Sequence, residues 1–266
     1  FLALTKTDDL VELDLAGDTL WLSSERVVSR FHEGVWAPLE TVSDGGYVFA
    51  VVPVGTQGDA WAFGYEGRTW RRTGGTWAAW PAPTSADLYD AVVRSPDDVW
   101  AVGFDYDAVT GVVVHFDGRA FEAETHAWLS RQLLRTIAGD HRGELWAGGC
   151  NGNDLPFMMR DRGSGTWEPV PLPAVGGCVQ HLSFTSDGRG LAALDRDILW
   201  WDGEGWQTMG VSPPEGFAWV RVAALRGGRE ITAIGPPSGW AVPGEPTWRG
   251  YIKGQAPWRI EGGSAA

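Results

Sequence analysis

The sequence feature that most constrains the fold is a repeat of about 44 residues. Each repeat contains a short apolar run that follows a turn, and four of the six runs carry a tryptophan. The runs begin at Asp18, Asp59, Asp98, Glu144, Gly190 and Glu230. A second aromatic residue follows a glycine turn in each repeat, at Trp36, Trp77, Phe121, Trp167, Trp206 and Trp258. A period of this length is typical of propeller blades and does not fit an eight-stranded sandwich.

The third repeat shows the pattern of four short strands most clearly. Runs rich in β-branched and aromatic residues at 88–94, 99–103, 111–116 and 120–123 predict the four strands. The last two runs are separated by Asp117-Gly118. An Asp-Gly pair between apolar runs is a strong hairpin signal, so these strands are expected to pair in sequence order.

The sequence therefore predicts an all-β fold, a six-bladed β-propeller of four-stranded antiparallel blades. One blade of this size cannot bury a core alone, so the tryptophans are expected to pack between neighbouring blades. We expect a single propeller domain over residues 1–261, followed by a flexible Gly/Ser tail at 262–266. The repeats are predicted near 10–42, 43–83, 84–127, 128–174, 175–213 and 214–261.

Composition excludes several functional classes. Aromatic residues make up 12% of the chain and hydrophobic residues 44%, which is enough apolar surface for folding and argues against disorder. The 34 acidic residues outnumber the 21 Lys and Arg, giving a net charge of −13. No nucleic-acid partner is expected, because phosphate binding needs Lys and Arg. No membrane insertion is expected, since no apolar run approaches the ~20 residues of a membrane span.

The repeat units SPDDVWAVG…VVVHFDGRAFE and GELWAGG…GSGTWEP resemble those of large secreted or surface-exposed bacterial propellers, of the kind common in myxobacteria. The resemblance covers residues 10–260, and such repeats are grouped loosely with galactose-oxidase, kelch and sialidase-like propellers. It carries over no catalytic residue, because the chain lacks the sialidase Asp-box, the kelch glycine pair and the GH…WD signature.

The resemblance implies that the loops between the second and third strands of a blade (b–c) share one face with the loops between blades (d–a). In this chain those loops are long and irregular, so ligand-binding residues are expected there. Aromatic rings beside amides and carboxylates suit a glycan, peptide or protein ligand. The candidates are Tyr106, His126, Trp128, Asn151, Asn153, Asp154, His181, Trp219 and Trp240. The alternative is that these rings only pack beneath the loops.

The chain has two cysteines, and both fall in loops of that face. Cys150 lies in the b–c loop of the fourth blade, and Cys178 lies in the next d–a loop. We expect a disulfide between them, with two buried thiols that pack as small apolar groups as the alternative. A disulfide favours an extracellular, periplasmic or cell-surface location.

The sequence offers no catalytic motif. It contains no G-x-S-x-G, no H-E-x-x-H and no C-x-x-C. We therefore expect a non-enzymatic binding propeller without a cofactor, either a monomer or a domain of a larger protein. The alternative is a six-bladed hydrolase or lyase with a channel calcium. Asn151, Asn153 and Asp154 would then be the calcium ligands, with His181 as a further ligand to test.

Overall fold

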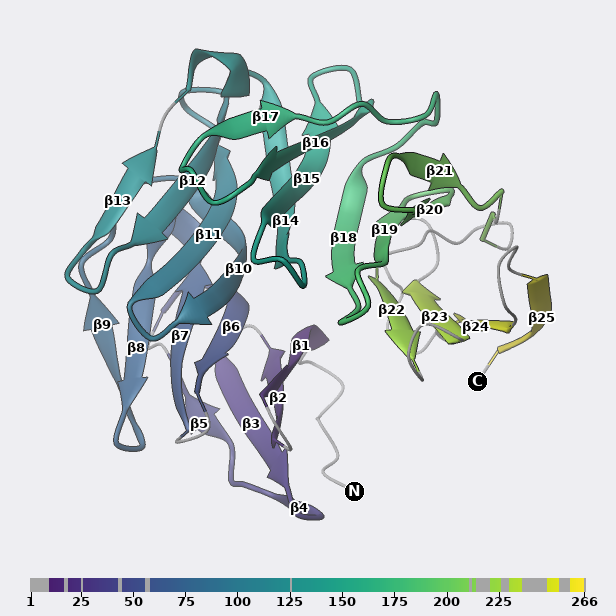
Figure 1. Cartoon of the computed structure of the whole chain (residues 1–266). Coiled ribbons are helices and arrows are strands. Elements are labelled where there is room, and N and C mark those ends of the chain that lie inside the picture. The colour runs from purple at the N-terminus through teal and green to yellow at the C-terminus, as the bar shows by residue number, and fades with distance from the viewer. Residues whose placement is uncertain are drawn as a thin grey trace. The chain divides into compact units, whose positions relative to one another are not determined.

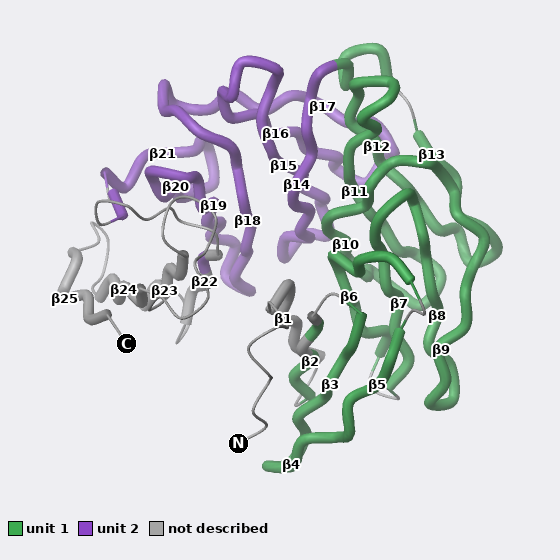
Figure 2. Tube along the Cα trace, turned by 180° about the vertical axis from the view of Figure 1, so that it is seen from behind, with its two compact units in different colours: residues 1–130 green, residues 131–266 purple. Residues whose placement is uncertain are grey.

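The computed structural model describes residues 10–16, 19–24, 26–42, 45–55, 58–124, 126–210, 212–213, 221–225, 230–235, 248–253 and 259–265. These residues form six antiparallel sheets, which confirms the predicted all-β class (Figure 1). The chain divides into two compact units, Phe1–Ser130 and Arg131–Ala266 (Figure 2). Among the described residues, no helix is long and apolar enough to cross a membrane.

The first unit contains three sheets whose strands follow one another along the chain. The first sheet comprises β1 (Leu10–Ala16), β2 (Thr19–Ser24), β3 (Val27–His32), β4 (Val35–Trp36) and β5 (Glu40–Thr41). The second comprises β6 (Val48–Val54), β7 (Asp59–Gly64), β8 (Thr69–Thr73) and β9 (Thr76–Trp80). The third comprises β10 (Asp87–Ser95), β11 (Asp98–Asp105), β12 (Thr110–Phe116) and β13 (Phe121–Glu124). Two 3-10 turns, η1 (Tyr65–Gly67) and η2 (Ala127–Leu129), lie in the connections.

The second unit also contains three sheets whose strands follow one another along the chain. Its first sheet comprises β14 (Gln132–Gly139), β15 (Leu145–Asn151), β16 (Pro156–Asp161) and β17 (Trp167–Pro169). The next comprises β18 (Val179–Phe184), β19 (Gly190–Leu194), β20 (Ile198–Trp201) and β21 (Trp206–Thr208). The last comprises β22 (Arg221–Leu225), β23 (Glu230–Gly235), β24 (Trp248–Lys253) and β25 (Arg259–Ala265).

The last strand differs from the sequence prediction. Residues 262–265, expected to belong to a flexible tail, lie in β25, where Gly263 pairs with Gly250 and Ala265 with Trp248. Composition was a poor guide here because a β-ladder is built from backbone N–H and C=O groups, which glycine and serine also carry.

In three of the described sheets, an aspartate closes the turn that joins the third and fourth strands. The Asp117 carboxylate accepts hydrogen bonds from the backbone N–H groups of Arg119 (2.9 Å) and Ala120 (3.0 Å). Asp202 does the same for Glu204 and Gly205, each at 2.8 Å. The hydrogen bond from the Ala120 N–H, followed by that from Arg119, holds the pKa of Asp117 below its ordinary value. Some of the acidic residues of the chain therefore serve to close turns.

A β-bulge recurs near the start of the first strand of five sheets. In β10, Leu88 pairs with Gly103 and Asp90 pairs with Val102, so Tyr89 is left as the extra residue. The equivalent extra residues are Val11, Phe49, Tyr89, Arg135 and Gln180. The bulge brings the two strands close together, and a Cβ on Gly103 would lie 1.8 Å from the Asp87 carbonyl oxygen. The final glycine of the repeat motif is therefore required inside a strand and not in a turn.

The core of each unit lies between neighbouring sheets. In the first unit the fully buried ring of Trp61, on β7, lies 5.0 Å from the rings of both Phe116 and Phe121 in the next sheet. In the second unit Trp146, on β15, lies 5.0 Å from Trp201 and 5.4 Å from Phe184. The repeat tryptophan thus fills the interface between one sheet and the next, which no single sheet could close.

An ionic cluster also ties the first two sheets together. The Glu40 carboxylate, on β5, accepts hydrogen bonds from Arg72 at 2.7 and 2.8 Å, from Arg30 at 3.0 Å and from the Trp77 indole at 3.1 Å. The Arg72 side chain is only 5% exposed. Its charge is therefore matched by a two-point ion pair inside the unit.

Candidate functional site

The predicted aromatic candidates of the first unit lie on adjacent loops. Tyr106 follows β11 and is 61% exposed, and its hydroxyl shares a 2.8 Å hydrogen bond with that of Tyr89. A bridge between Thr110 and Ser130 holds this loop beside the segment that carries the other two candidates. There the rings of His126 and Trp128 stack with their centroids 5.3 Å apart.

Part of this aromatic group is already occupied by contacts within the unit. His126 Nε2 lies 3.5 Å from the Glu124 carboxylate. Tyr106 packs edge-on against Phe104 at 5.0 Å, and Tyr89 lies 5.1 Å from Phe49. The contacts form two groups of rings on adjacent loops, one around Tyr89 and Tyr106 and the other of His126 and Trp128.

The predicted polar candidates of the second unit act mainly in a turn. The Asn151 side-chain oxygen accepts hydrogen bonds from the backbone N–H groups of Asn153 (2.9 Å) and Leu155 (3.2 Å). Asp154 adopts a left-handed φ of 56° in this turn, and its backbone N–H donates to the Asn151 carbonyl at 3.0 Å. Asn151 therefore closes the β15–β16 connection, as asparagine commonly does in turns.

His181 serves a contact between sheets. Its Nδ1 accepts a hydrogen bond of 3.5 Å from the backbone N–H of Val222, so it joins β18 to β22. Its ring is thereby directed at the next sheet, apart from the turn closed by Asn151. The two remaining candidates, Trp219 and Trp240, lie outside the described residues.

The predicted disulfide is confirmed. Cys150 and Cys178 are bonded, with their Cα atoms 4.6 Å apart. Asp154 completes the group of described residues that could hold a metal by distance, but both cysteines are consumed by the bond. The covalent link joins the end of β15 to the residue before β18, and it therefore fixes the bases of two loops at once.

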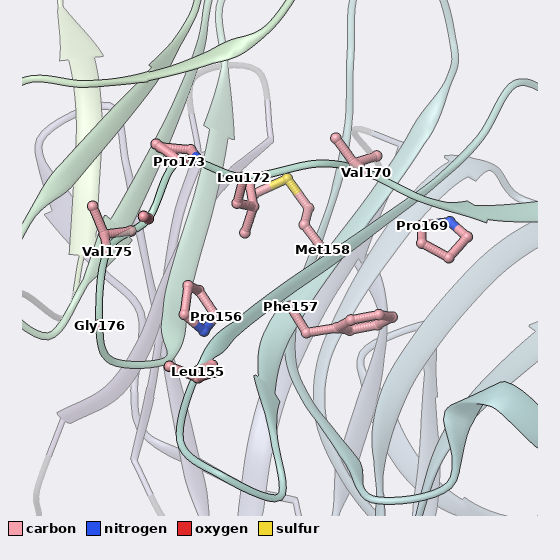
Figure 3. A pocket seen from close by; sticks show the side chains of 11 residues that line it. Leu155, Pro156, Phe157, Met158, Pro169, Val170, Leu172, Pro173, Val175 and Gly176 are labelled. Atoms are coloured by element: carbon pink, nitrogen blue, oxygen red, sulfur yellow. The ribbon is translucent and has the colours of Figure 1, made fainter.

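These two loops line a groove of about 520 Å³ in the second unit (Figure 3). Its floor is Met158, which is 1% exposed and belongs to the unit's core. Leu172 and Val175 pack on the same core and rise from it as a wall. The residues that line the groove are Leu155, Pro156, Phe157, Met158, Pro169, Val170, Leu172, Pro173, Ala174, Val175 and Gly176.

The side chains that line the groove are apolar. Each described residue in its lining has a side chain made of carbon, hydrogen and sulfur, or none at all. Along the chain, Leu155 follows the exposed Asp154, and Pro169 follows the exposed Glu168, whose carboxylate lies 3.8 Å from Arg162. The site therefore combines apolar lining side chains with acidic residues next to them in the sequence, a composition suited to a ligand that is apolar in the middle and basic at its edges.

The loops that the sequence analysis singled out at 150–156 and 171–181 both contribute residues to this groove. Within them, the sequence singled out Asn151, Asn153, Asp154 and His181 for their polar groups, whereas the concave surface is built from their apolar neighbours. The one available signal was the run Pro169-Val-Pro-Leu-Pro173, since a loop with alternating prolines and aliphatic residues is pre-organised and exposes apolar surface.

The known proteins that are similar to this chain identify its fold but no family. No family model matches the sequence, and no curated protein matches it either. Virginiamycin B lyase from Staphylococcus aureus superposes with a TM-score of 0.75 at 12% identity, over 100% of this chain and 86% of that one.

Two further propellers are similar in structure. YCF48 from Cyanidioschyzon merolae has a TM-score of 0.68 at 16% identity, over 100% of this chain and 89% of that one. A structure of YCF48 bound to D1 peptide is also similar, with a TM-score of 0.67 over 96% of this chain and 81% of that one. The WD40 β-propeller domain of Doa1 has a TM-score of 0.56 at 10% identity, over 70% of this chain and 60% of that one.

These likenesses define the class of protein. Their low sequence identities show the fold alone, and that fold is a β-propeller built from four-stranded antiparallel blades. The similar structures include both a lyase and a peptide-bound protein, so function has to be argued from this chain's own site.

Proposed function

We propose that this chain is a six-bladed propeller that binds an extended apolar segment of a protein partner in the groove of its second unit. The six sheets of the described residues support this blade number. The observation that carries the function is the apolar groove between the β15–β16 and β17–β18 loops. Its volume of about 520 Å³ lies within the range of pockets that bury a ligand of a few residues.

The lining favours a peptide over a glycan. A sugar presents hydroxyl groups that need donors and acceptors, and the described lining side chains offer neither. Leu, Val and Pro side chains of a peptide would instead remove apolar surface from water at about 25 cal/mol per Å². A hydrolase or lyase site would need an acid, a base or a nucleophile, and the described lining side chains include none.

The construction of the groove supports binding without a large ordering cost. Pro156, Pro169 and Pro173 have fixed φ angles and lack N–H groups, so the rim is stiff. The Cys150–Cys178 bond fixes the points from which the two loops leave the sheets. A pre-organised site loses little conformational entropy when its ligand binds.

Charge selects among apolar segments. The protein carries a net charge of −13, and the exposed Asp154 and Glu168 directly precede lining residues of the groove in the sequence. The proposed partner segment therefore has Lys or Arg on both sides of its apolar run, because such a segment gains from complementary potentials. The disulfide supports an oxidising location, extracellular, periplasmic or at the cell surface, which agrees with the bacterial surface propellers that the repeats resemble.

The test is a matched pair of substitutions. Leu155 is 49% exposed at the groove, and Leu39 is 48% exposed in the first unit, outside the groove lining. A synthetic library of peptides with Leu/Val/Pro runs flanked by lysines is titrated by fluorescence anisotropy. We expect micromolar binders whose affinity falls at least about tenfold in Leu155→Asp, because a buried charge has no partner there. Leu39→Asp should bind as the wild type does.

Three outcomes would overturn the proposal. They are a library without any binder, an equal loss in Leu155→Asp and Leu39→Asp, and a loss confined to Trp128→Ala. The last result would move the site to the rings of His126 and Trp128 in the first unit.

A further inference from the structure

The second unit has another cavity, at the opposite ends of the strands that carry the groove. This polar pocket measures about 320 Å³ and is formed by three short turns. His141 and Arg142 come from the β14–β15 turn, and the segment Asp187–Arg189 comes from the β18–β19 turn. Trp200, Trp201, Asp202 and Gly203 complete the lining, from β20 and the turn after it. Two neighbouring blades therefore share the pocket.

A close contact defines the shape of this polar pocket. Gly188 has a φ of +90°, and a Cβ on it would lie 2.5 Å from the His141 ring. The imidazole consequently rests directly on the backbone of the next blade's turn, which forms one wall. Glycine is required at this position both for the left-handed backbone and for the approach of the ring.

The polar groups of the pocket balance in charge. Arg142 and Arg189 supply two positive charges, and Asp187 and Asp202 supply two negative ones. Arg189 and Asp187 already form an ion pair with each other at 3.4 Å, which leaves Arg142 as the guanidinium most accessible to a ligand. One oxygen of Asp202 accepts N–H groups of its own turn, and the Gln207 side chain also forms a hydrogen bond with this carboxylate. Hydrogen bonds from the Gly205 and Glu204 N–H groups lower the pKa of Asp202, so the carboxylate is an acceptor at neutral pH.

The two adjacent tryptophans have different roles. The Trp201 ring packs 5.0 Å from Trp146 and 5.8 Å from Trp206, so it belongs to the core between blades. Trp200 is half-buried, and within the part of the chain that the structure describes no ring contact or hydrogen bond involves its side chain. Its indole is therefore available to a ligand in the pocket.

We propose that this polar pocket binds a neutral carbohydrate residue. Paired donors and acceptors in one small site match the vicinal hydroxyls of a sugar, and guanidinium and carboxylate groups bond two such oxygens at once. The C–H face of a sugar ring packs on an indole, whose own N–H can bond a further hydroxyl. The balanced charge favours a neutral ligand over an isolated anion or cation.

The test uses calorimetric titration of a panel of neutral methyl glycosides and disaccharides. We expect millimolar or tighter binding of at least one saccharide, and a loss of at least about tenfold in Arg142→Ala. Arg119→Ala is the matched control, because Arg119 is an exposed arginine in a turn of the first unit. Trp200→Ala removes the indole from the pocket and tests its role in binding. In case this variant fails to fold, His141→Ala, at an exposed position of the same pocket, takes its place. Leu155→Asp should leave saccharide binding unchanged, which separates this pocket from the groove.

The proposal fails if no saccharide binds or if Arg142→Ala and Arg119→Ala behave alike. It also fails if inorganic phosphate binds as tightly as the best saccharide and loses its affinity in Arg142→Ala. That result would assign the pocket to anions.

Discussion

At the scale of single residues, the repeat tryptophans are each covered by a side chain from the neighbouring strand. Trp61 pairs across the ladder with Arg71, whose guanidinium lies 5.0 Å from the ring, and Trp146 pairs with Arg160 at 4.8 Å. In the third sheet His115 takes this position and stacks on Trp100 at 3.9 Å. A cation over an indole adds about 0.5–2 kcal/mol to the burial of the ring.

In the second strand of a sheet, the glycine beside the bulge is the residue that tolerates substitution least. Gly103→Ala places a Cβ against the Asp87 carbonyl, so we expect a loss of about 3 kcal/mol in the free energy of unfolding. Gly176→Ala is the control, because its Cβ would meet nothing within 4 Å. Urea denaturation of both variants measures the difference, and equal stabilities would contradict the account of the bulge.

At the scale of elements, two kinds of tie hold neighbouring sheets together, one ionic and one covalent. Partial burial of Glu40 raises its pKa, but the hydrogen bond and charge of Arg72 outweigh this, with help from Arg30 and Trp77. The pKa therefore lies below its ordinary value of 4.5. A carboxyl with a lowered pKa stabilises the fold above its ordinary pKa, and that contribution is lost as the pH falls through the folded value.

Glu40→Gln should therefore destabilise the protein in a pH-dependent way. At pH 7 we expect a loss of about 3 kcal/mol, because the buried Arg72 is left without its counter-charge. The gap between variant and wild type should narrow below pH 4.5 and close as the pH falls through the lowered pKa of Glu40, where its folded-state carboxylate becomes protonated. Urea denaturation at several pH values measures the gap. Glu122→Gln, at an exposed site, should show no such trend.

The covalent tie should contribute to both stability and binding. The disulfide closes a loop with a sequence separation of 28 residues, for which chain entropy predicts about 3–4 kcal/mol. We expect the double variant Cys150→Ser/Cys178→Ser to lose this amount and to bind the groove peptides more weakly. Thermal denaturation should also show that a reductant lowers the Tm of the wild type and leaves the double variant unchanged.

The elements were far easier to predict than the site. The strands expected at 99–103 and 111–116 appear as Asp98–Asp105 and Thr110–Phe116, because alternating apolar residues and turn signals are local information. The groove depends on which apolar residues remain uncovered after packing. Leu155 and Leu172 lie in predicted loops, and only the tertiary arrangement shows that they line the same concavity.

At the scale of the whole molecule, the net charge of −13 should govern how the proposed partner associates. We expect the affinity for a lysine-flanked peptide to fall at least about tenfold between low salt and 0.5 M NaCl, since salt screens exposed charges. A serine-flanked peptide of the same apolar run should be nearly insensitive. If the affinities of the two peptides depended equally on salt, charge would not explain the selectivity of the groove.

The recurring bulge divides the strand positions around it into those that must keep their residue type and those that can change it. Tyr89 and its equivalents Val11, Phe49, Arg135 and Gln180 are the extra residues of the ladder, whereas glycines 64, 103 and 149 lie opposite the residue before three of the five bulges. A saturation mutagenesis screen should tolerate most residue types at the first set and almost none at the glycines. The propeller thus offers a set of reprogrammable positions on an invariant backbone, from which new surfaces can be selected without redesigning the fold.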